Sequence, residues 1–163
     1  MKTGITRRER EVTDMQEIIG ILDRAKIVHV GMIDNGKPYV VPMNYGYTME
    51  DGKLTLYLHG ATQGRKIDAL RANPNVFVEI DTDIIPFEGE AACQHGVSYA
   101  SVMGEGVAEL IEDAQGKMES LSVLMKTQTG KEFAFTDKMV FGVTVIKVAV
   151  SQYTAKRRPL PMR

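Results

Sequence analysis

The sequence predicts a mainly β protein with a few helices, an α+β fold in which six antiparallel strands form one small barrel. Apolar and polar residues alternate in several short segments, which is the period of strands with one buried face. Tight-turn signals such as Asp34-Asn35-Gly36 join these segments. Most connections are too short for the crossover helices of a parallel sheet, and closing an antiparallel sheet into a barrel removes its exposed edges.

The composition indicates a single domain that covers residues 1–163. Hydrophobic residues make up 44% of the chain and charged residues 25%, which is typical of a globular protein with a real core. The 20 basic and 21 acidic side chains give a formal charge of -1, which argues against nucleic acid or a membrane surface as the main partner. The single cysteine, Cys93, allows no internal disulfide, and no apolar run approaches the ~18 residues of a membrane span. We therefore expect a cytoplasmic protein.

The first segments are an irregular arm and a helix. Residues 1–12 are mostly polar and predict the arm. Thr13 or Asp14 can cap a helix, and Glu17 lies in its first turn, where a carboxylate suits the helix dipole. Four apolar residues at helical spacing are expected to face the core: Met15, Ile18, Ile19 and Leu22.

Two strands are expected next. Residues 27–33 alternate as a strand, and the turn at residues 34–36 leads into a second strand at residues 38–47. Pro42 inside the second strand must lie at a sheet edge, at a bulge or where no ladder partner is needed. Residues 50–52 (Glu-Asp-Gly) form the next turn.

The central stretch, residues 53–75, predicts a strand, a turn of small residues and a helix. Leucines alternate with polar residues in the strand, at Leu54, Leu56 and Leu58. Arg65 and Lys66 begin the helix, and Asn73-Pro74 ends it. Two cations beside the free N–H groups of a helix N-terminus favour an anion site, and we predict a phosphate there. The alternative is a pair of solvated charges in the first turn of the helix.

The second half of the chain predicts two more strands around a long loop and a helix. Residues 75–81 are the fourth strand, and residues 82–97 are a long loop. Residues 98–111 are the fifth strand, in which Gly104 and Gly106 indicate a bulge or a close backbone approach.

A helix at residues 112–127 and a last strand at residues 141–150 follow, and the basic tail at residues 154–163 is expected at the surface. The helix has one apolar face, made of Met118, Leu121, Leu124 and Met125.

The histidines and the cysteine predict no metal site. His29 lies in an apolar strand, where a hydrogen-bonded or exposed histidine is commoner than a ligand. Cys93-Gln94-His95 brings two ligand types together, but nothing else at metal-site spacing accompanies them. The glycines at residues 104–106 lack the strand-to-helix context of a dinucleotide fingerprint.

The order of these segments resembles the pyridoxamine 5'-phosphate oxidase-like split barrels that bind flavin mononucleotide (FMN). Within them, the chain is most similar to the branch related to nitroimidazole-resistance reductases. The likeness covers residues 13–156 and depends on PYVVPMNYGY, LYLHGATQGRK, the Asn-Pro after the helix and YASVMGEGVAEL. It implies a split barrel and a homodimer with two flavin sites at the subunit interface.

The resemblance also assigns residues to the cofactor, namely Pro42, Met43, Asn44, Tyr45, His59, Gly60, Arg65, Lys66, Ser101 and Val102. Arg65 and Lys66 would hold the phosphate, and the strand at residues 42–45 would line the isoalloxazine ring, partly through backbone groups. His59 and Gly60 would contact the phosphate or the ribityl chain. Ser101 and Val102 would come from the fifth strand, in relatives often that of the partner subunit.

The function implied is that of an FMN-dependent oxidoreductase that reduces a small organic acceptor, with nitroaromatic compounds such as nitroimidazoles among the acceptors to test. His59 is the candidate catalytic proton donor. Two alternatives stay open: a flavin carrier or sensor without turnover, and a member of the same fold that binds haem or a deazaflavin. Ala155 stands where many relatives have glycine, so the tail is expected to run differently. The arginine-rich substrate site of the vitamin B6 oxidases is not evident, which argues against pyridoxamine phosphate as substrate.

Overall fold

The structure, a computed structural model, describes residues 5–162, and one eight-stranded sheet runs through most of it. The strands are β1 (Glu11–Val12), β2 (Ile27–Asp34), β3 (Lys37–Asn44), β4 (Gly46–Glu50), β5 (Lys53–Gly60), β6 (Asn75–Phe87), β7 (Gly96–Ile111) and β8 (Thr144–Arg158). The helices are α1 (Met15–Arg24), α2 (Arg65–Ala72), α3 (Ala114–Thr129) and α4 (Asp137–Phe141), with short 3-10 helices η1 (Arg8–Arg10) and η2 (Ala92–Gln94).

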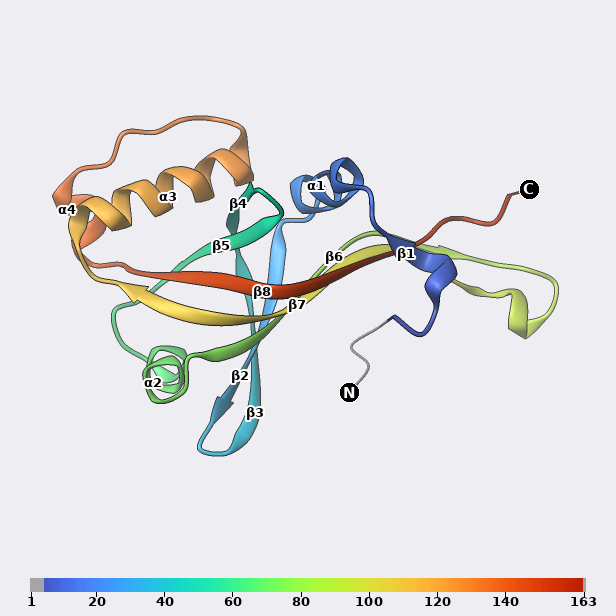
Figure 1. Cartoon of the computed structure of the whole chain (residues 1–163), viewed down its shortest axis with the longest axis horizontal. Helices are drawn as coiled ribbons and strands as arrows, with labels where there is room; N and C mark the ends of the chain where they lie inside the picture. The colour runs from blue at the N-terminus through green and yellow to red at the C-terminus, as the bar shows by residue number, and fades with distance from the viewer. Residues whose placement is uncertain (1–4, 163) are drawn as a thin grey trace.

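Every strand pair is antiparallel, and the order across the sheet is β3-β2-β6-β7-β8-β5-β4, with β1 added beside β8. No pairing joins β3 to β4 within residues 5–162, so the barrel is split rather than closed. The predicted α+β split barrel is confirmed, although the sheet has eight strands where six were expected. In Figure 1, β6, β7 and β8 cross the width of the molecule, and the β2–β3 hairpin lies at its lower edge.

The predicted strand at residues 38–47 is in fact two strands, because the chain leaves the sheet edge at Tyr45. β3 pairs with β2, whereas β4 pairs with β5 on the other side of the split. The Tyr45 side chain is fully buried, and its hydroxyl donates to the carbonyls of Leu22 (2.6 Å) and Ala25 (3.2 Å) at the end of α1. Pro42 lies in β3, at the edge of the sheet, as its missing N–H requires.

Half of the predicted loop at residues 82–97 is strand. β6 continues to Phe87 and β7 begins at Gly96, so residues 88–95 alone join them. The pairing of β6 with β7 shifts register between Thr82 and Ile85, which marks a bulge. Asp83 adopts a left-handed φ of 57° in this bulge.

Both chain ends also differ from expectation. Residues 154–158 of the expected surface tail belong to β8 and pair with β7 and β1. Ala155 is buried and lacks the positive φ that would require glycine, so alanine fits the backbone at this position. The expected irregular arm at residues 1–12 includes η1 and β1, and its first four residues lie outside the described part of the chain.

Two hydrophobic clusters hold the helices to the sheet. Asp14 caps α1 by accepting from the N–H of Gln16 at 2.7 Å, and α1 buries Ile18, Ile21 and Leu22 against the inner sheet face. The expected helix at residues 112–127 begins at Ala114, and with α4 and the start of β8 it forms a second cluster of Leu121, Val140 and Val145. No helix in residues 5–162 is long and apolar enough to cross a membrane.

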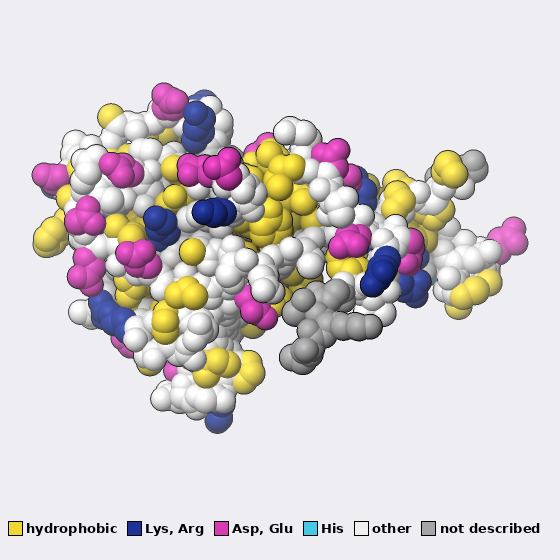
Figure 2. All heavy atoms as spheres, viewed as in Figure 1, with side chains coloured by type: hydrophobic (Ala, Val, Ile, Leu, Met, Phe, Trp, Pro, Cys, Tyr) yellow, Lys and Arg dark blue, Asp and Glu magenta, His cyan; other side chains and the backbone are white. Residues whose placement is uncertain are grey.

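The sheet face opposite the core is called the outer face below. It carries the residues of β2, β3, β6 and β7 that alternate with core residues, among them His29, Ile33, Val40, Pro42, Asn44, Phe77, Glu79, Asp81, Ser101, Met103 and Val107. On the face shown in Figure 2, acidic and basic side chains are interspersed around a hydrophobic strip between α1 and the β4–β5 hairpin.

Candidate functional site

The turn from β5 into α2 places several of the predicted cofactor residues together. β5 ends at Gly60, and Gly64 takes a φ of 132°, which other residues rarely adopt, to start α2 at Arg65. No side chain caps α2 with a hydrogen bond. The N–H groups of its first turn are therefore available to an anion.

Lys66 and His59 pack around Gly60. A Cβ at Gly60 would lie 2.8 Å from Cε and 3.2 Å from Nζ of Lys66, so glycine lets the ammonium lie against the backbone. The Nδ1 atom of His59 is buried without a hydrogen-bond partner in residues 5–162. Burial, and secondly the charge of Lys66, lower the pKa of His59, which favours the neutral imidazole at pH 7.

Arg65 is held from the side by the β2–β3 hairpin. Its Nε donates to Oδ2 of Asp34 at 2.6 Å, and its guanidinium lies 3.9 Å from the centre of the Tyr39 ring. The side chain is still 59% exposed. The guanidinium keeps four N–H donors on its terminal nitrogens, so the ion pair orients Arg65 without using all of its donors.

The four predicted residues at 42–45 divide between two faces. Pro42 and Asn44 lie on the outer face, whereas Met43 and Tyr45 are buried in the core. The Tyr45 hydroxyl is already bonded to α1. Met43 and Tyr45 can therefore reach a ligand only through backbone groups.

Ser101 and Val102 divide in the same way. Val102 is a core residue, and Ser101 lies on the outer face between Asp81 of β6 and Lys156 of β8. His59, by contrast, lies opposite Val145, near the other end of β8. Within one chain, the structure does not bring Ser101 to the β5–α2 turn.

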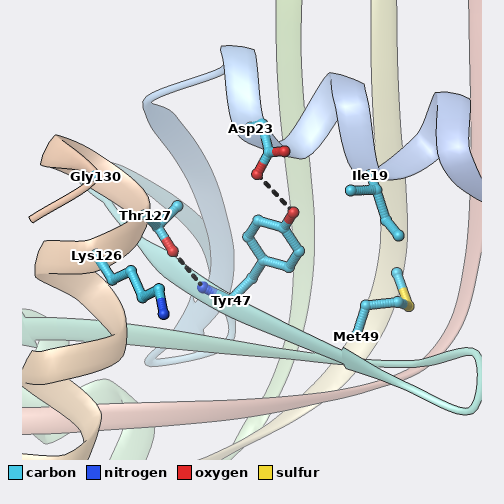
Figure 3. Close-up of a pocket in the computed structure, with 7 residues that line it drawn as sticks. All are labelled: Ile19, Asp23, Tyr47, Met49, Lys126, Thr127 and Gly130. Carbon is cyan, nitrogen blue, oxygen red and sulfur yellow. Dashed lines mark hydrogen bonds between the residues drawn. The ribbon is translucent and has the colours of Figure 1, made fainter.

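A separate hollow lies between α1, β4 and α3, with a volume of about 580 Å³ (Figure 3). The Tyr47 hydroxyl donates to Oδ1 of Asp23 at 2.7 Å, and the Tyr47 N–H donates to Oγ1 of Thr127 at 3.3 Å. Burial and the bond to Asp23 raise the pKa of the Tyr47 hydroxyl. None of the predicted cofactor residues lines this hollow, and no local spacing in the sequence indicates it, because its residues come from three separate elements.

His29 is hydrogen-bonded, as expected: its Nδ1 lies 2.9 Å from Oε2 of Glu79, its partner on β6. Burial raises the pKa of Glu79, and the neighbouring Asp81 adds to the increase while His29 opposes it. Cys93 is exposed in η2.

The comparisons agree with the fold. The family model described as pyridoxamine 5'-phosphate oxidase matches residues 14–157. A candidate 5-nitroimidazole antibiotic resistance protein from Bacteroides thetaiotaomicron is 36% identical, with a TM-score of 0.77 over 90% of this chain and 86% of its own.

Two more distant structures share the fold. The flavocytochrome Anf3 from Azotobacter vinelandii is 24% identical, with a TM-score of 0.78 over 98% of this chain and 74% of its own. A FAD- and haem-binding protein from Mycobacterium smegmatis is 19% identical, with a TM-score of 0.77 over 94% and 76%. No curated protein matches. From the family match and the 36% identical structure, the chain belongs to the pyridoxamine 5'-phosphate oxidase family.

Proposed function

We propose that this protein binds FMN as a homodimer and transfers electrons from the flavin to a small organic acceptor. The observation that carries the proposal is the β5–α2 turn, where Arg65, Lys66 and His59 surround an uncapped helix N-terminus. The 36% identical relative makes a 5-nitroimidazole the first acceptor to test.

The residues of the turn fit a phosphate group. Arg65 can donate through its terminal nitrogens while Asp34 and Tyr39 fix its plane, and Lys66 adds a compact positive charge. The first-turn N–H groups of α2 supply further donors. When bound, FMN supplies the electron-transfer chemistry, and the protein's part is position and electrostatics.

His59 would act beside the flavin as a neutral hydrogen-bonding group rather than as a positive charge. A neutral imidazole carries one N–H donor and one acceptor nitrogen, and its buried Nδ1 has no partner among residues 5–162. Such a group can fix a ligand atom or supply a proton at a defined position.

The outer face supports a dimer with shared sites. Phe77 and Val107 are 45% and 49% exposed there, and Val40 is 58% exposed. A nearly apolar hollow of about 300 Å³ lies beside Phe77. A second chain on this face would bury these side chains, and it would bring a partner's outer-face residues, Ser101 among them, toward the flavin. We expect a contact that buries more than ~1,000 Å² in total.

The test begins with the absorbance spectrum of the purified protein and titration of the apo protein with FMN, FAD and riboflavin. Flavin bands and tighter binding of FMN than riboflavin would support the proposal. A Soret band in place of flavin bands would instead support the haem alternative.

A second measurement separates an enzyme from a carrier. The bound flavin is reduced without oxygen and mixed with a 5-nitroimidazole or a quinone, and its reoxidation is followed against free reduced FMN. Faster reoxidation in the protein than in solution indicates an oxidoreductase. A rate no higher than that of free FMN would contradict turnover and favour a carrier or sensor.

A further inference from the structure

Three side chains with metal-ligand chemistry meet on the outer face, away from the β5–α2 turn. His29 of β2 and Glu79 of β6 are direct partners across the sheet, and Asp81 follows on the same face of β6. One ligand atom from each residue lies within 4.8 Å of the other two. The His29 and Glu79 atoms are 2.9 Å apart.

The two carboxylates of this group, Glu79 and Asp81, have few positively charged partners. Asp81 makes no hydrogen bond and no ion pair with any residue in the range 5–162, although its side chain is partly buried. Glu79 has His29 as its only such partner in that range. Lys156 lies two strands from Asp81, beyond Ser101, and forms no ion pair with it. Two neighbouring carboxylates, of which only Glu79 is bonded to an imidazole, favour an added cation.

The ligand set indicates which cation. One imidazole nitrogen and two carboxylate oxygens, with no sulfur, suit a borderline divalent metal such as Zn²⁺ rather than a soft one such as Cu(I). Tetrahedral ligands at ~2.0 Å from zinc lie about 3.3 Å from one another. All three ligands stand on directly paired strands, with their ligand atoms within 4.8 Å of one another.

We propose that His29, Glu79 and Asp81 form a divalent-cation site with one coordination position left open. Three protein ligands with an open fourth position are the arrangement of zinc sites that take a water or a substrate. The sequence predicts no metal here, because His29 has no ligand type at metal-site spacing in its own strand and the two carboxylates come from a strand fifty residues later. The cation ligands include none of the phosphate-binding residues at the β5–α2 turn, but they adjoin two residues assigned to the flavin, since His29 pairs with Pro42 and Asp81 with Ser101.

The experiment uses the full-length protein, freed of metal with a chelator and then titrated with Zn²⁺ in a calorimeter. We expect one Zn²⁺ per chain. His29→Ala, Glu79→Gln and Asp81→Asn should each weaken binding by about 10- to 100-fold. His95→Ala and Cys93→Ser, which remove the other exposed histidine and the single thiol, should bind as the wild type does.

Melting temperatures show whether a variant that fails to bind Zn²⁺ is still folded. Without metal, Asp81→Asn should melt at or above the wild-type temperature, because it removes a carboxylate repulsion. With saturating Zn²⁺ the order should reverse, since only the wild type gains the full binding energy. Failure of the wild type to bind Zn²⁺ more tightly than ~100 μM, about 5.5 kcal/mol, would overturn the proposal. So would unchanged binding in Asp81→Asn, or a loss of binding in the two control variants equal to that in His29→Ala.

Discussion

At the scale of single residues, the proposed phosphate site depends on how Arg65 is held. Asp34 takes only its Nε, and Tyr39 supports the flat face of the guanidinium. A lysine at this position could not bond Asp34 and present parallel donors to a phosphate at once. Arg65 and Lys66 are therefore expected to play unequal parts.

Arg65→Ala should weaken FMN binding by roughly 10- to 150-fold, since a charge-assisted hydrogen bond contributes about 1.5–3 kcal/mol and 1.4 kcal/mol is tenfold. Lys66→Ala should have a smaller effect. Neither change should alter riboflavin binding, because riboflavin has no phosphate. The measurement is fluorescence titration of the apo variants with both flavins.

The matched control for this pair is Arg71→Ala, in the last turn of the same helix. This variant also removes one positive charge from α2, but at the C-terminal end of the helix, far from the proposed phosphate. FMN affinity should therefore stay within about twofold of wild type. Equal losses for FMN and riboflavin in Arg65→Ala would show that Arg65 supports the fold rather than the phosphate.

His59 should make the apo protein less stable in mild acid. The pKa of His59 is lowered in the folded state. Just below about pH 6.5 the histidine is therefore protonated in the unfolded chain but still largely neutral in the folded one. The free energy of unfolding should therefore fall as the pH decreases through that range. His59→Gln, which cannot be protonated, should remove this part of the decline in urea unfolding at pH 5, 6 and 7.

His95→Gln is the control, because His95 is exposed in the connection between β6 and β7. That variant should keep the wild-type decline. If His59→Gln has the same slope as wild type, protonation of His59 is not the cause.

At the scale of elements, the bulge in β6 is held by charges from two other elements. Arg24 of α1 donates to both carboxylate oxygens of Asp83, at 3.0 and 2.8 Å, and Nη2 of Arg157 in β8 lies 3.5 Å away. These contacts lower the pKa of Asp83, through Arg24 first. The bulge thereby joins α1 to the long strands.

Asp83→Asn should cost about 1 kcal/mol of stability at pH 7, the upper end for a partly exposed pair. Asparagine tolerates the left-handed backbone at this position, so the change removes mainly the charge. Because the folded pKa is depressed, the wild-type advantage is complete above about pH 3.8 and should shrink as the pH falls below it. Urea unfolding at several pH values measures both effects.

Asp51→Asn provides the comparison, since Asp51 also has a positive φ of 49° but no ion pair among residues 5–162. It should change stability by less than ~0.5 kcal/mol. An equal loss of stability in both variants would show that the loss comes from the backbone conformation rather than from the ion pair.

The contact between β4 and α3 depends on Gly46. A Cβ there would lie 2.3 Å from Cα of Leu124, so backbone would meet backbone. Gly46→Ala should therefore destabilise the protein by roughly 1–3 kcal/mol or more. Gly142→Ala, in open space at a φ of −89°, should have little effect. Thermal melting of the two variants compares them directly, and similar losses would mean that α3 can move aside.

At the scale of the whole molecule, the outer face is where a second chain would complete the proposed flavin site. Ser101 and the β5–α2 turn lie near opposite ends of β8 in one chain. A site that uses both needs a second chain. The oligomeric state therefore bears on the function directly.

Phe77→Glu should break the dimer, because it buries a carboxylate in an apolar contact. Phe141→Glu, at a phenylalanine that is 85% exposed on α4, should leave it intact. Sedimentation at micromolar concentration measures both variants. A monomeric wild type would falsify the dimer and the shared site together.

Features that depend on a few neighbouring residues could be predicted from the sequence. The positive φ at Asn35-Gly36 and Asp51-Gly52 follows from turn chemistry within each hairpin, and the Asp14 cap lies within one helical turn of its donors. The alternation of β5 and the start of α2 at Arg65 are equally local. For this reason the split-barrel class and the residues of the β5–α2 turn could be predicted.

Tertiary structure decided what depends on partners far along the chain. The break at Tyr45 exists because its hydroxyl bonds the end of α1, 23 residues earlier. The sequence predicts a surface tail at residues 154–158, whereas in the fold these residues pair with β7 and β1. The meeting of His29 with Glu79 depends on the register of two strands fifty residues apart. Charge and periodicity in a short window do not specify such pairings, since they fix which face of a strand is buried but not which distant strand lies beside it.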